Sequence, residues 1–103
     1  MKLARQGDVL IKATNKPEVE LTKAQKIDGR WILAEGEATG HAHAIKAAKG
    51  VVLWMTAAAM YLEARRQVKI EHEEHAPIML PPGWYEIRRQ REYEPDGWRQ
   101  VAD

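Results

Sequence analysis

The chain has 103 residues, of which 45% are hydrophobic and 30% charged, with a formal net charge of +1 and no cysteine. This balance predicts one globular domain over residues 1–103, and the charge favours neither nucleic acid nor an anionic membrane. Without cysteine, disulfides, thiolate nucleophiles and cysteine-based zinc sites are excluded, so a metal site must use nitrogen and oxygen ligands. No signal peptide and no apolar run of about 18 residues is recognisable, so we expect a cytoplasmic protein without a membrane span.

Turn residues divide the chain into short apolar segments. We expect strands at 9–11, 31–34, 41–45, 51–56, 61–64, 68–71, 84–94 and 98–101, with turns at Gly7-Asp8, Asp28-Gly29, Lys49-Gly50 and Pro95-Asp96-Gly97. Residues 56–66 fit either a short helix capped by Thr56 or part of a hairpin, and the pattern favours strands. Short strands separated by turns at roughly 8–12 residues predict an all-β fold, either a small single-domain barrel or a sandwich.

The four histidines of the chain fall into two close pairs, His41 with His43 and His72 with His75. Alternate residues of a strand share a face, so the first pair projects side by side, with the Cα atoms about 6–7 Å apart. The second pair shares a face only if the chain turns between its members, which the nearby Pro77 makes credible. Imidazole is the commonest transition-metal ligand. We therefore expect a divalent metal site built from His41, His43 and His75, with His72 as second choice.

Acidic residues beside both pairs offer a carboxylate ligand, namely Glu35, Glu37, Glu73 and Glu74. Three histidines and a water form an open site suited to metal-dependent hydrolysis. Two histidines and one carboxylate suit a non-haem iron oxygenase instead. Zinc, iron, manganese and nickel all accept such ligands. A site without metal is an alternative, in which one histidine acts as base and another as acid to cleave a phosphodiester.

The densest positive cluster lies in the expected strand 84–94 and consists of Arg88, Arg89 and Arg91. Strand alternation places Arg89 and Arg91 on one face and Arg88 on the other. Arginines near Trp84 and Tyr93 are typical of surfaces that bind single-stranded nucleic acid. A second hypothesis is therefore a non-enzymatic module that binds nucleic acid or a protein partner. Small β domains also often self-associate through edge strands, which leaves a monomer and a homo-oligomer open.

The first histidine pair lies in a segment that resembles the start of the first cupin motif, Gly36-Glu37-Ala38-Thr39-Gly40-His41-Ala42-His43. The resemblance implies a jelly-roll fold in which His41 and His43 bind the metal. The spacing departs from the cupin pattern, because the glycine lies one residue closer to the pair. The glutamate expected several residues after the pair is also missing from residues 45–49.

Two longer segments look like parts of small uncharacterised bacterial and phage proteins. They are Ile32–His43, and His72–Ile78 with Leu80–Gly83 and Arg89–Tyr93. Together they cover about a third of the chain. The resemblance implies a compact β domain and supports the histidine pairs as a site, but it implies no particular activity.

Overall fold

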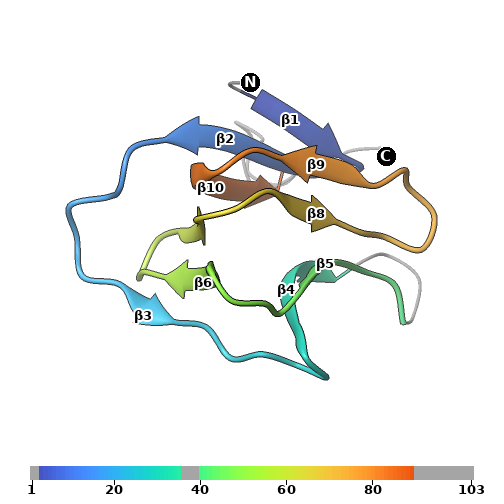
Figure 1. Ribbon diagram of the computed structural model, residues 1–103, viewed down its shortest axis with the longest axis horizontal. Helices are drawn as coiled ribbons and strands as arrows, with labels where there is room; N and C mark the ends of the chain where they lie inside the picture. The colour runs from blue at the N-terminus through green and yellow to red at the C-terminus, as the bar shows by residue number, and fades with distance from the viewer. Residues whose placement is uncertain (1–2, 36–39, 90–103) are drawn as a thin grey trace, which may run out of the picture.

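The computed structural model describes residues 3–35 and 40–89, in which ten strands form two facing layers (Figure 1). The strands are β1 (Leu3–Gln6), β2 (Val9–Thr14), β3 (Thr22–Lys23), β4 (Arg30–Glu35), β5 (Ala42–Lys46), β6 (Val51–Met55), β7 (Met60–Ala64), β8 (Val68–Ile70), β9 (Ile78–Leu80) and β10 (Gly83–Arg89). The turn expected at 95–97, the strand expected at 98–101 and Arg91 lie outside the described residues. No helix in the described part of the chain is long and apolar enough to cross a membrane.

The first layer is an antiparallel sheet in the order β1-β2-β10-β7-β6-β3. The second layer consists of the pairs β4-β5 and β8-β9. Two backbone hydrogen bonds join these pairs, since the N–H groups of Ala44 and Glu71 each donate to the other residue's carbonyl, at 3.0 and 2.8 Å. In Figure 1, β9 passes in front of β2 and β10, and β8 lies beside β9. The predicted all-β fold is confirmed in its sandwich form, and the closed-barrel alternative is wrong.

Tight turns connect several strands as the sequence predicts. Gly7, at φ 59°, begins the two-residue turn between β1 and β2. Asp28 and Gly29, at φ 53° and 72°, have the two positive angles of a type I′ turn. At residues 56–59 the Thr56 hydroxyl accepts hydrogen bonds from the N–H groups of Ala58 and Ala59. Thr56 therefore caps a turn between β6 and β7, and the helix alternative is wrong.

The core lies between the two layers. Side chains of a strand point alternately inward and outward, and the core contains the inward-facing ones. The fully buried side chains are Val9, Ile11, Leu53 and Leu62 from the first layer and Ile70 and Leu80 from the second. β10 shows the alternation clearly, because Tyr85 and Ile87 are buried whereas Trp84 and Glu86 are half-buried. Burying this apolar surface is the main favourable term in folding. It also holds β8 and β9, whose connection carries half of the predicted site, against the first layer.

Candidate metal centre

The four imidazole rings meet at one end of the second layer. His43 lies in β5 and His41 directly precedes that strand, while His72 and His75 lie in the connection from β8 to β9. Because the Ala44–Glu71 bridge aligns β5 with this connection, the two pairs come together. The ring of His72 is central, with its centroid 4.3 Å from that of His43, 4.6 Å from His75 and 5.6 Å from His41. The structure thus gathers all four imidazoles, where the sequence favoured three.

A bend at residues 73–75 places His75 beside the other rings. The Nδ1 atom of His72 accepts hydrogen bonds from the backbone N–H groups of Glu74, at 3.0 Å, and His75, at 3.3 Å. A neutral imidazole that accepts at Nδ1 carries its proton on Nε2, which assigns the tautomer of His72. Burial and the neighbouring His75 lower the pKa of His72, which favours this neutral form.

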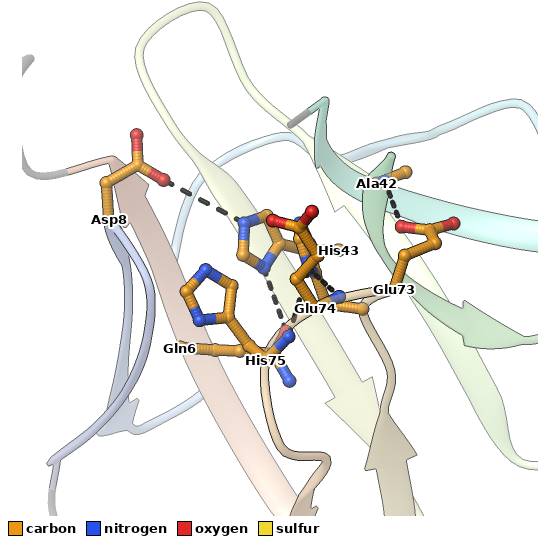
Figure 2. A network of polar contacts seen from close by, with 8 residues as sticks. Gln6, Asp8, Ala42, His43, Glu73, Glu74 and His75 are labelled. Carbon is orange, nitrogen blue, oxygen red and sulfur yellow. Dashed lines mark hydrogen bonds and ion pairs between the residues drawn. The ribbon is translucent and has the colours of Figure 1, made fainter. Parts of the chain in front are cut away.

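Gln6 fixes the tautomer of His43, which is only 2% exposed. The Nε2 atom of Gln6 donates to the carbonyls of Ile70, at 3.1 Å, and Ala76, at 3.0 Å. Both amide protons are therefore in use, and only Oε1 is left to face His43 Nδ1, at 2.8 Å (Figure 2). Since Oε1 can only accept, His43 must donate from Nδ1. The Nε2 atom of a neutral His43 then carries a free lone pair.

The lone pair of His43 lies near a buried carboxylate. Asp8 is 8% exposed, and its Oδ1 atom lies 3.8 Å from His43 Nε2 (Figure 2). Burial, followed by the neighbouring His72, lowers the pKa of His43 to about 4 even though Asp8 acts to raise it. At neutral pH His43 is therefore uncharged, and an unprotonated nitrogen and a carboxylate oxygen lie close together inside the protein.

Gly7 lets the β1–β2 turn lie directly against two of the imidazoles. A Cβ atom at this position would lie 2.8 Å from His75 Nε2 and 3.3 Å from His43 Cε1, both closer than ordinary contact. The positive φ of Gly7 independently favours glycine. The tripeptide Gln6-Gly7-Asp8 thus supplies a hydrogen-bond acceptor, a close approach and a carboxylate to the site. Figure 2 shows Gln6 and Asp8 beside His43.

A second group of donors, half-buried or exposed, lies on the side of the cluster away from Asp8, which we call the mouth, and His75 is exposed as well. Ligand atoms of His41, His72 and Glu73 lie within 4.8 Å of one another. Glu73 Oε1 accepts the backbone N–H of Ala42 at 2.9 Å, and this hydrogen bond lowers the pKa of Glu73. Glu74 Oε2 lies 3.8 Å from His41 Nδ1. Of the other acidic candidates, Glu35 is exposed at the end of β4 and Glu37 lies outside the described residues.

The basic strand divides between two faces. The guanidinium of Arg88 pairs with Glu86, at 3.0 Å, on the outer face of β10. Arg89 lies on the inner face with Ile87. Tyr85 is buried, and its hydroxyl donates to the Pro81 carbonyl at 2.6 Å, so its ring is not available to stack on a base. The described part of the strand therefore lacks the continuous basic and aromatic face of the nucleic-acid hypothesis.

Comparison with known protein families gives a match over most of the chain. One family of domains matches residues 5–90, a range that includes the Gln6-Gly7-Asp8 turn and all four histidines. The chain belongs to the DUF8820 family, a domain of unknown function. The expected membership in a group of uncharacterised small domains is thereby confirmed. No curated protein and no solved structure matches the chain, so the cupin resemblance and its jelly-roll fold stay predictions.

In this DUF8820 domain, the sequence identified the histidines but not the residues that hold them. Gln6 and Asp8 act on partners 35 to 70 positions away, and their roles become visible only when the turn is placed against β5. The Gly7-Asp8 turn itself was predicted. A turn pattern defines local geometry, however, and does not say which part of the molecule the turn faces.

Proposed function

We propose that the domain binds one divalent transition-metal ion between the buried His43 Nε2 and Asp8 Oδ1, with the exposed His75, whose ring stacks on that of His43 at 5.9 Å, turning in as the third ligand. One observation carries the proposal, which is the hydrogen bonding of Gln6. It leaves the buried His43 with its Nε2 lone pair directed toward a carboxylate. Histidines that bind metals almost always donate their other ring N–H in this way, which fixes the tautomer and the orientation of the ring.

The separation of the two buried donors suits an intervening ion. With ligand bonds of about 2.0–2.2 Å, the 3.8 Å between His43 Nε2 and Asp8 Oδ1 corresponds to a ligand–metal–ligand angle of roughly 130°. A tetrahedral angle needs the two atoms to approach to about 3.4 Å, which is a small adjustment of two side chains. A cation would also stabilise the close approach of a lone pair and a buried carboxylate.

The group of donors at the mouth fits a supporting role better. The Nδ1 atom of His72 already accepts two backbone N–H groups, which leaves the proton on Nε2. A metal bound at Nδ1 of His72 would therefore break the hydrogen bonds of the bend. A metal bound at Nε2 would displace the proton from that nitrogen. Glu73 is likewise engaged with the Ala42 N–H. In this proposal His72 orients His75, and His41 lies at the entrance.

An ion with three protein ligands keeps a position open for water or substrate. Bound zinc lowers the pKa of that water and supports hydrolysis, while iron held by two histidines and one carboxylate supports oxidation. The metal-free alternative has less support, because a general base works best with a pKa near the working pH and that of His43 is about 4. We place this chemistry in a cytoplasmic protein of bacterial or phage origin.

Zinc titration of the purified protein, by competition with a chromophoric chelator, tests the proposal. We expect micromolar or tighter binding of one equivalent. His43→Ala and Asp8→Asn should weaken zinc binding by more than the roughly 10–100-fold that is typical of losing a residue that only hydrogen-bonds to a ligand. His41→Ala and Glu73→Gln serve as matched controls from the mouth and should change the affinity little. Loss of zinc only in the two controls would move the ion to the mouth, and no binding by the folded wild-type protein would overturn the proposal.

A further inference from the structure

Arg89 is an inward-facing cation at the end of β10. Its Nε atom is buried and, within residues 3–35 and 40–89, has no hydrogen-bond partner. The neighbouring Arg88, on the outer face, pairs with Glu86. Burying part of a guanidinium without a partner is costly. A cation held in this way is therefore suited to receive an anion.

Arg89 contributes to a cavity of about 240 Å³ between the two layers. Leu33 lines it from the second layer, and Met60 and Ile87 line it from the first. The turn at residues 55–59 closes one side, and Arg89 is the charged member of the lining. The cavity is therefore of mixed character, lined by apolar side chains, the polar turn and one cationic group.

Strand pairing relates the lining of the cavity to the residues of the proposed metal centre. Arg89 is the cross-strand partner of Val9, which directly follows Asp8. Leu33 precedes Ala34, the cross-strand partner of His43. Both walls of the cavity thus continue into strands and turns that carry the metal-site residues.

We infer that this cavity is the substrate subsite of the proposed metal centre and binds small organic carboxylates. Arg89 holds the carboxylate, because the guanidinium matches its planar geometry with two parallel N–H donors. Leu33, Met60 and Ile87 contact the hydrocarbon part. The cavity is smaller than the roughly 300–1,000 Å³ of drug-sized pockets, so it selects molecules of a few carbon atoms. The substrate role of the bound carboxylate rests on the proposed metal function, whereas carboxylate binding itself does not.

Titration with acetate, butyrate and hexanoate, followed by NMR chemical shifts, tests this subsite. The protein is used both metal-free and loaded with zinc. We expect the affinity to rise about fourfold for each CH₂ group that enters the cavity. Arg89→Gln should reduce the affinity for butyrate at least tenfold, whereas the matched variant Arg88→Gln should bind butyrate like the wild type.

Two results would overturn the inference while zinc binding still stands. One is an affinity that does not depend on chain length, or that the two arginine variants reduce equally. The other is inorganic phosphate binding more tightly than hexanoate, which would assign the pocket to a different anion. Carboxylate binding by a protein that never binds zinc would instead overturn the metal centre, and leave Arg89 as a carboxylate site without that role.

Discussion

Gln6 is the residue on which the chemistry of His43 depends most. Its amide makes three hydrogen bonds, to the Ile70 and Ala76 carbonyls and to His43 Nδ1. Gln6→Met keeps the approximate size of the side chain and removes all three. We expect the free energy of unfolding to fall by about 1–3 kcal/mol, because buried polar groups lose their partners.

The same variant should weaken zinc binding by roughly 10–100-fold, since the orientation and tautomer of His43 are no longer fixed. Urea unfolding and chelator competition measure the two effects. An unchanged zinc affinity in a destabilised Gln6→Met protein would show that Gln6 supports only the fold.

Gly7 and Gly29 offer a matched comparison of two turn glycines. Both have a positive φ, but a Cβ at Gly29 meets nothing within 4 Å, whereas one at Gly7 meets His75 Nε2 at 2.8 Å. Each alanine substitution should cost about 1–2 kcal/mol for the left-handed backbone. Only Gly7→Ala should also displace His75 and weaken zinc binding.

Thermal unfolding and zinc titration of both variants give the answer. Equal zinc affinities in Gly7→Ala and Gly29→Ala would contradict the close approach of the β1–β2 turn to the imidazoles.

Among the elements, the turn between β6 and β7 depends on one hydroxyl. Thr56 Oγ1 accepts from the N–H groups of Ala58, at 3.1 Å, and Ala59, at 2.8 Å. Thr56→Val keeps the shape and removes the acceptor, so we expect a loss of about 1 kcal/mol in unfolding free energy. Thr56→Ser keeps the hydroxyl and should lose less than half of that. Similar losses in both variants, measured by urea unfolding, would show that the methyl group and not the hydroxyl stabilises the turn.

The strands with strong local patterns could be predicted from the sequence. β6 is rich in β-branched and aromatic residues, and the Asp28-Gly29 turn specifies its own positive angles, so both follow from local chemistry. β1, β3 and β9 were missed for a physical reason. The segments Leu3–Gln6, Thr22–Lys23 and Ile78–Leu80 have only two to four residues, and each forms a strand because a neighbouring strand pairs with it.

At the scale of the whole molecule, the stability of the metal-free protein should depend on pH through His43. Its pKa is about 4 in the folded protein and 6.5 as the ordinary value, so between these values the unfolded chain binds more protons. The free energy of unfolding should therefore decrease as the pH falls from 6.5 toward 4. The loss from this one group is about 2–3 kcal/mol by pH 4.5.

His43→Leu removes this titrating group, so the free energy of unfolding should fall less steeply as the pH is lowered. The variant should also be less stable than the wild type at pH 7. His72, whose pKa is also lowered, stays in the variant and keeps a smaller slope in the same direction. Urea unfolding from pH 7.5 to 4.5 compares the two proteins. Parallel pH profiles would contradict a buried, neutral His43.

The candidate site could be predicted only in part. Clustering in the sequence was enough to select His41, His43, His72 and His75. Their arrangement could not be predicted, because it depends on the Ala44–Glu71 bridge between two strand pairs, which no local pattern encodes. The residues that distinguish the Asp8 side of the cluster from the mouth come from a hairpin at the other end of the chain.

The most direct test of this account is long-range ¹H–¹⁵N NMR of the imidazole nitrogens, with and without zinc. In the metal-free protein we expect His43 to be protonated at Nδ1 and unprotonated at Nε2. One equivalent of zinc should shift the Nε2 resonance of His43 strongly and leave the nitrogens of His41 nearly unchanged. A proton on Nε2 of His43 in the metal-free protein, or zinc shifts confined to His41 and His72, would contradict the proposed centre.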